Sequence, residues 1–61
     1  MTAATLIKLI EAVGWEEVRQ RGSHRVFKHT DLPDLIVVPD HGKKDIGPGL
    51  LNSILKTAGL K

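Results

Sequence analysis

Four cationic side chains surround a histidine between residues 19 and 28, a segment without acidic residues. The histidine is His24, and the cations are Arg19, Arg21, Arg25 and Lys28. An imidazole exchanges protons near neutral pH, so His24 could act as a general base. Nearby cations favour the neutral imidazole and attract an anionic substrate. These properties suit RNA cleavage by the RNA's own 2′-hydroxyl group, with the cations stabilising the phosphorane. The same sequence pattern would occur if His24 were an ordinary surface residue of a hairpin without a chemical role, and this alternative stays open.

The sequence disfavours other kinds of catalytic site. It contains no cysteine, which excludes disulfides, thiolate catalysis and sulfur-ligated metals. His24 and His29 are five positions apart and would point to opposite faces of a strand, so they could not bind one metal ion together. The neighbours Ser23 and His24 would also point to opposite faces, which disfavours a Ser-His-Asp hydrolase. The Gly-Pro-Gly segment at 47–49 lacks the Lys-Ser/Thr pair of a phosphate-binding loop. We therefore expect neither a metal ion nor a cofactor.

Length and composition indicate one small domain over residues 1–61. Hydrophobic residues make up 41% of the chain, as in globular proteins, and the net charge at pH 7 is only +2. No segment approaches the ~20 apolar residues that span a bilayer, so we expect no membrane association. A secreted domain of this size would usually need disulfides, and we therefore expect a cytoplasmic location.

Apolar residues at helical spacing predict a helix at each end of the chain. In the first, over residues 2–13, the apolar face comprises Leu6, Leu9, Ile10 and Val13. Thr2 is the expected N-cap, and Gly14 should end the helix, with Trp15 packing after it. In the second, the apolar face comprises Leu51, Ile54, Leu55 and Ala58, and Gly59 follows it.

Three extended segments lie between the helices, at residues 15–20, 23–29 and 35–38. Their short connections favour an antiparallel meander, because parallel neighbours need a much longer crossover. The expected fold is therefore α+β, in the order α-β-β-β-α, with a three-stranded antiparallel sheet and both helices on one face. We expect Trp15, Phe27 and the four aliphatic residues 35–38 in the core. Phe27, if exposed, is the candidate for stacking on an RNA base.

The loop at residues 41–49 carries Lys43 and Lys44 and leads into the second helix. A helix N-terminus offers free N–H groups and a positive dipole end, which suit a phosphate. A loop with an ordinary helix entry explains the same residues, and both interpretations stay open.

Three further motifs occur in order along the chain. Residues 22–27 read Gly-Ser-His-Arg-Val-Phe, residues 38–41 read Val-Pro-Asp-His, and residues 49–59 form the expected last helix. Together with the Gly14-Trp15 boundary, these motifs resemble the HicA toxin family over essentially the whole chain. The resemblance implies a fold similar to that of double-stranded-RNA-binding domains. It also implies the activity of an mRNA interferase, a metal-independent endoribonuclease, and a HicB-type antitoxin that covers the active site.

The resemblance also implies roles for individual residues. The family's catalytic histidine falls on His24, and a second histidine of the family falls on His41. The proton for the leaving group could come from His41, His29, a lysine or water. The expected RNA-binding residues are Arg21, Ser23, Arg25, Lys28, His41, Lys43 and Lys44.

Two other functions compete with the ribonuclease. A double-stranded-RNA-binding module without catalytic activity would share the fold. Such modules usually carry lysines at the start of the last helix, where this chain has Gly-Pro-Gly-Leu-Leu at 47–51. A purely structural protein could instead dock another chain through the aliphatic third strand. We expect the ribonuclease, with mRNA as its substrate.

Overall fold

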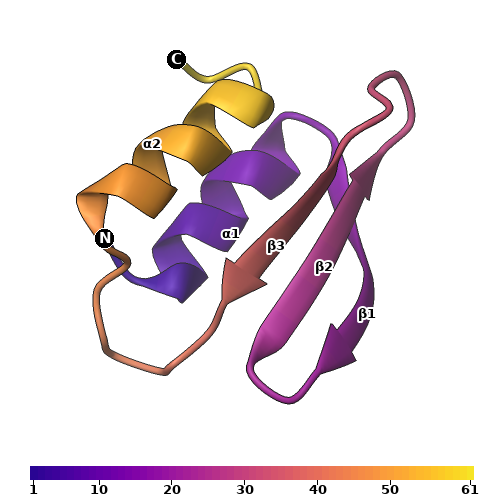
Figure 1. The fold of residues 1–61 in the computed structure, drawn as a ribbon. Helices are drawn as coiled ribbons and strands as arrows, with labels where there is room; N and C mark the ends of the chain where they lie inside the picture. Colours follow the sequence, from indigo (N-terminus) through magenta and orange to yellow (C-terminus); the bar gives the residue numbers. More distant parts are fainter.

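The computed structural model describes all 61 residues, which form two layers (Figure 1). The elements are α1 (Ala3–Ala12), β1 (Trp15–Arg21), β2 (His24–His29), β3 (Leu35–Pro39) and α2 (Pro48–Thr57). The two helices lie side by side on one face of the three-stranded sheet, and the other face is uncovered. This arrangement confirms the predicted α+β fold and its α-β-β-β-α order. Neither helix is long and apolar enough to cross a membrane.

The ends of the elements follow local sequence signals. Thr2 caps α1 by accepting the N–H of Thr5 on its side-chain oxygen, as predicted. Gly14 follows α1 with a φ of +102°, in the region that favours glycine. β2 is the central strand and pairs antiparallel with β1 and β3, which confirms the predicted meander. The turn between β1 and β2 consists of Gly22 and Ser23.

A β-bulge decides which residues of β1 face the helices. The register shifts between Glu17 and Arg19, and Val18 is the additional residue. Opposite residues of an antiparallel pair share a face, so Glu17 lies on the helix-covered face with its partner Phe27. Trp15, two residues earlier, lies there too and is only 1% exposed. An unbulged strand would have placed Val18 on this face and Trp15 on the open one.

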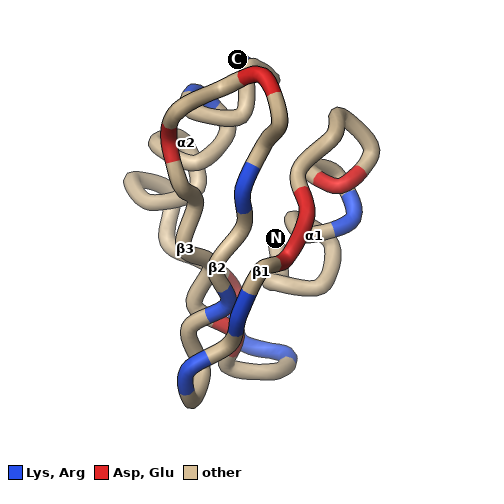
Figure 2. Tube along the Cα trace, turned by 90° about the vertical axis from the view of Figure 1, so that its right-hand side faces the viewer, with Lys and Arg blue, Asp and Glu red and all other residues tan.

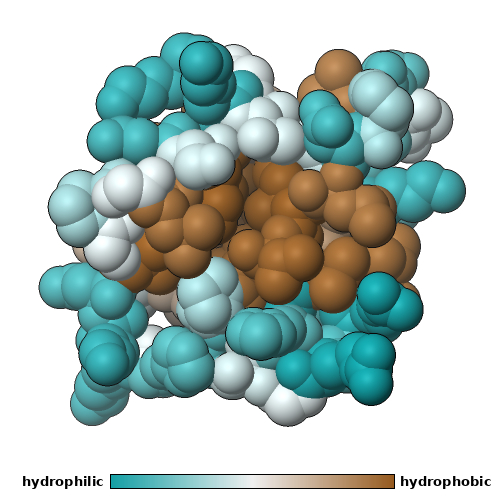
Figure 3. Space-filling view, viewed as in Figure 1, coloured by the Kyte–Doolittle hydropathy of each residue, from teal (hydrophilic) through white to brown (hydrophobic).

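The core lies between the helices and the sheet. Its members are Ala3, Leu6, Ile7, Ile10, Trp15, Phe27, Ile36, Val38, Ile46, Ile54 and Ala58. The helices contribute unequally, because α1 buries four side chains within its length and α2 buries only Ile54. Leu51 and Leu55 of α2 are partly buried. Figure 3 shows hydrophobic surface in a band across the side where the helices and β3 meet.

The apolar face of α1 is rotated from the predicted one. Leu9 and Val13 were expected in the core but are 40% and 39% exposed, whereas Ile7 is buried. Leu6 and Ile10 are common to the predicted and observed faces. A small rotation about the helix axis therefore buries Ile7 in place of Leu9 and Val13, and packing against the sheet decides which of the two faces is buried.

Only two of the four aliphatic residues of β3 are buried. Ile36 and Val38 face the helices, whereas Leu35 and Val37 are 57% and 45% exposed on the open face. The prediction that all four belong to the core was wrong, because side chains of a strand alternate and the helices cover one face only. Phe27 is completely buried, as expected of a core residue, and so it is not available to stack on an RNA base.

Candidate active site

His24 opens β2 directly after the β1–β2 turn and is exposed. Side chains of a strand alternate, so His24 shares a face with Val26 and Lys28. Phe27, on the other face, is buried against the helices. His24 therefore lies on the open face of the sheet, where a large substrate can reach its imidazole.

The neighbours of His24 come from both flanking strands. Arg21 of β1 and Pro39 of β3 are its cross-strand partners and share its face. Ser23, in the turn, is half-buried, and its carbonyl oxygen accepts the N–H of Asp40 at 2.6 Å. This bond extends the β2–β3 pairing by one step and brings the loop after β3 to the same end of the sheet as His24.

Arg25 lies on the helix-covered face, away from His24, and forms two ion pairs. Its Nε and Nη2 atoms each donate to a carboxylate oxygen of Glu17 at 2.8 Å. Its Nη1 atom donates to Asp40 Oδ2 at 3.2 Å. The hydrogen bonds from Arg25 hold the pKa of Glu17 below its usual value, and the same bonds raise the pKa of Arg25. The positive charge of Arg25 is thus offset within the protein.

His41 stands in a turn just after β3. The Oδ1 atom of Asp40 accepts the N–H of Gly42 at 3.1 Å, which forms an Asx-type turn around His41. His41 is exposed and lies two residues beyond Pro39, the cross-strand partner of His24. The two histidines named by the motifs are therefore at the same end of the sheet, although they are 17 positions apart in the sequence.

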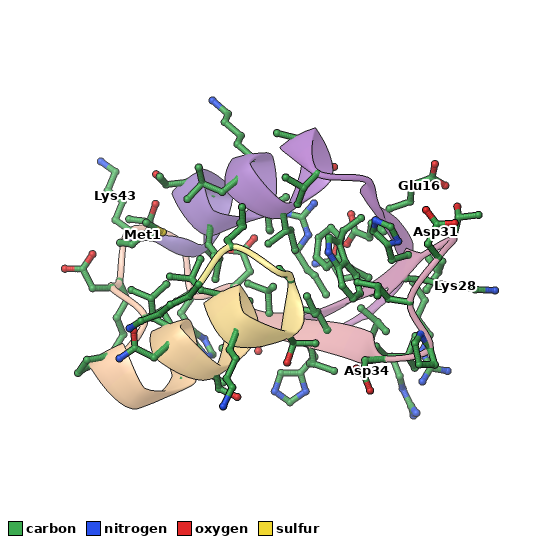
Figure 4. The ribbon with its side chains drawn as sticks, turned by 90° about the horizontal axis from the view of Figure 1, so that it is seen from above. Met1, Glu16, Lys28, Asp31, Asp34 and Lys43 are labelled. Atoms are coloured by element: carbon green, nitrogen blue, oxygen red, sulfur yellow. The ribbon has the colours of Figure 1, made fainter.

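The predicted basic residues do not form one continuous surface. Lys28 and Lys43 lie at opposite ends of the molecule (Figure 4). Lys28 shares its end with Glu16, Asp31 and Asp34, and Glu16 is its cross-strand partner. Figure 2 shows acidic residues in the β2–β3 loop at the upper end and basic segments gathered toward the lower end. The end that carries the β1–β2 turn is therefore the cationic one.

An open depression occupies the acidic end of the open face, lined by Glu16, Val18, Lys28 and Thr30. His24 does not line it and is about 13 Å from Lys28 along β2, at 3.3 Å per residue. No pocket forms around His24 itself. A surface without a pocket suits a polymer better than a small molecule, which needs a concave site.

His29 has a structural role. Its Nε2 atom is 2.9 Å from the carbonyl oxygen of Val13, and its Nδ1 atom accepts the N–H of Asp31 at 3.0 Å. These partners assign a neutral imidazole with its proton on Nε2. The ring also packs on Trp15, with ring centroids 5.2 Å apart. His29 lies on the opposite face from His24 and cannot give a proton to a substrate bound there.

Sequence reasoning missed the two carboxylates that bind Arg25. In a strand without a bulge, Glu17 would lie opposite Lys28 on the open face. The sequence therefore held no signal that Glu17 contacts Arg25. Asp40 belongs to the Val-Pro-Asp-His motif, which was its only signal. No group of three or more His, Asp or Glu side chains is arranged to hold a metal ion.

Comparison with known proteins agrees with the motifs. Residues 3–60 match the sequence profile of a family described as the HicA toxin of bacterial toxin–antitoxin systems. The chain belongs to the HicA toxin family. A relative described as a probable mRNA interferase HicA, from Pseudomonas fluorescens (strain Pf0-1), is 44% identical over 52 residues. The aligned region makes up 85% of this chain and 83% of the relative. As a HicA toxin, the chain is one half of a toxin–antitoxin pair, and an antitoxin is its partner.

Proposed function

We propose that this HicA toxin is an mRNA interferase that cleaves RNA without a metal ion and uses His24 as its catalytic base. The position of His24 carries the proposal, since its imidazole is exposed on the open face, beside Arg21, at the cationic end of the sheet. The 44% identical relative, described as a probable mRNA interferase, supports the same activity. Because mRNA is the proposed substrate, the proposed location is the cytoplasm.

The reaction needs one base and one acid. The neutral imidazole of His24 takes the proton of a ribose 2′-hydroxyl, and the 2′-oxygen attacks the adjacent phosphorus. The bond from phosphorus to the 5′-oxygen then breaks, and that oxygen takes up a proton. The products are a 2′,3′-cyclic phosphate and a 5′-hydroxyl. A well-placed general base accelerates such a step by ~10²–10⁴-fold.

The proposed RNA contacts surround His24. Arg21 supplies the charge on the same face, and Ser23 adjoins the histidine in the turn. The loop with His41 contributes the exposed Lys43 and Lys44. Lys28 extends the open face toward the acidic end, so its contribution should be smaller. Arg25 is left out of this set because two carboxylates hold its guanidinium on the other face.

A HicB-type antitoxin is the proposed partner, and it would cover the open face. The aliphatic residues Val18, Leu35 and Val37 are 54%, 57% and 45% exposed there, and no element of this chain covers them. An antitoxin on this face would bury these side chains and exclude RNA from His24. Adding it should therefore abolish RNA cleavage and raise the thermal midpoint of the toxin.

RNA cleavage in the presence of EDTA tests the proposed function. The wild-type protein should cut a labelled RNA and leave 2′,3′-cyclic phosphate ends, whereas His24→Ala should bind the RNA without cutting it. The exposed imidazole of His24 makes no hydrogen bond within the chain, so His24→Ala should keep the thermal midpoint of the wild type. Lys8→Ala, on the exposed side of α1, is the matched control and should cut normally. If wild type and His24→Ala both bind RNA and neither cuts it, the protein is a binding module and the proposal fails.

A further inference from the structure

Asp40 connects Arg25 to the turn that carries His41. Its Oδ2 atom accepts from Arg25, its Oδ1 atom accepts from the N–H of Gly42, and its own N–H donates to the Ser23 carbonyl. Both carboxylate oxygens and the backbone N–H are thus engaged, each with a different segment. The backbone on either side of His41 is consequently held against the β1–β2 turn.

Arg25 is in turn held by Glu17 on β1. The two bonds between them are parallel and bidentate, the geometry that fixes a guanidinium plane most firmly. The side chains of Arg25, Glu17 and Asp40 are all about one quarter exposed, between 26% and 27%. The chain of contacts therefore runs from β1 through β2 to the turn at residues 40–42, underneath the face on which His24 stands.

We infer that Arg25 is a positioning residue that acts through Asp40 to hold His41 beside His24, where His41 protonates the leaving 5′-oxygen. The inference rests on the proposed ribonuclease function. In this step the His41 imidazolium gives its proton to the 5′-oxygen as the bond to phosphorus breaks, while His24 keeps the proton taken from the 2′-hydroxyl. Proton exchange with water then restores both histidines.

A direct contact between Arg25 and RNA makes different predictions. Removing a cation that binds phosphate weakens RNA affinity and lowers its dependence on salt. Removing a positioning residue leaves both nearly unchanged and lowers kcat instead. A substitution of Asp40 distinguishes RNA contact from positioning further, because a carboxylate does not attract a phosphate. Loss of the Asp40 carboxylate would therefore lower kcat only if Arg25 acts by positioning.

The kinetic test compares Arg25→Gln, Asp40→Ala and His41→Ala with the wild type. Arg25→Gln and Asp40→Ala should lower kcat by ~10–100-fold with little change in KM, because misplacing a reacting group by about 1 Å can cost about 10²-fold. His41→Ala removes the acid itself and should lower kcat at least as much. The loss of activity on the alkaline side of the pH–rate profile, where a general acid is deprotonated, should disappear in all three. Arg25→Gln should have no further effect once His41 is alanine.

Two controls separate positioning from a general loss of stability. Ile54→Val removes one methylene from the core at α2 and should lower the thermal midpoint while leaving kcat and the pH profile unchanged. Asp40→Asn keeps an amide oxygen for the N–H of Gly42 but loses the charge that binds Arg25. Its kcat should lie between those of the wild type and Asp40→Ala. A loss of RNA affinity in Arg25→Gln with unchanged kcat would overturn the inference. So would an undiminished effect of Arg25→Gln on kcat when it is added to His41→Ala.

Hydrogen exchange at the Gly42 amide tests the contact without using activity. The amide should be protected in the wild type and should exchange at least tenfold faster in both Arg25→Gln and Asp40→Ala. If the wild type does not cut RNA, the proposed function fails, and this result still shows whether Arg25 orders the turn. Unchanged protection in Arg25→Gln would overturn the positioning role even in an active enzyme.

Discussion

The two histidines of β2 show how the face of a strand decides the role of a residue. His24 points to the open side and has no partner within the chain, whereas His29 bonds to Val13 and Asp31 and packs on Trp15. His29 also determines which residue can follow α1. A Cβ atom at Gly14 would lie 2.7 Å from His29 Nε2, and the φ of Gly14 is +102°. This position therefore accepts only glycine without rearrangement.

Gly14→Ala should destabilise the protein more than Gly22→Ala does. Both glycines have a positive φ, and an alanine there costs about 1–2 kcal/mol of strain. Only at Gly14 would the new methyl group also displace His29, because nothing lies within 4 Å of a Cβ at Gly22. Urea unfolding of the two variants measures the difference. Equal losses of stability would show that the contact between Gly14 and His29 contributes nothing.

At the scale of elements, the bulge in β1 connects the strands to the loop after β3. By adding Val18 it turns Glu17 to the helix-covered face, where Arg25 binds Glu17 and also reaches Asp40. One irregularity thus places Trp15 in the core and makes the ion pairs possible. α2 takes little part in this arrangement and is held to the core mainly by Ile54 and Ala58.

The ion pair between Arg25 and Glu17 should make stability depend on acid pH. The hydrogen bond from Arg25 lowers the pKa of Glu17 below 4.5 in the folded state, so the fold is stabilised above pH 4.5 and loses this contribution as the pH falls through the lowered pKa. The thermal midpoint of the wild type should therefore fall more steeply below pH 4.5 than that of Glu17→Gln. Glu16→Gln, the neighbour without an ion pair, should follow the wild type. Identical pH profiles for Glu17→Gln and the wild type would contradict the prediction.

At the scale of the whole molecule, charge and exposed apolar surface are divided between regions. The β2–β3 loop is acidic, the opposite end of the sheet carries the β1–β2 turn and the loop lysines, and the open face between them exposes aliphatic side chains. A net charge of +2 spread evenly would attract RNA only weakly. Its concentration at the end with His24 directs an anionic polymer to that end.

Salt dependence of RNA binding tests this division of charge. In a His24→Ala background, which prevents cleavage, Arg21→Ala should weaken binding and reduce the slope of log affinity against log salt by ~1. Lys28→Ala, at the acidic end, should have a smaller effect, and Lys8→Ala on α1 should have none. Equal effects of all three substitutions would show that RNA responds to net charge alone.

The sequence by itself determined the type, order and ends of the elements, because these depend on contacts between near neighbours. Thr2 and Gly14 mark the ends of α1, short turns require antiparallel strands, and the motif around His24 identifies the family. The tertiary structure alone decided which faces are covered. The alternation of side chains assigns two faces to β3 but does not say that Val37 stays exposed. Helical spacing likewise allows two alternative buried faces of α1. The bulge, and with it the partners of Arg25, arises only when β1 packs Trp15 against the helices, so these contacts depend on residues far apart in the chain.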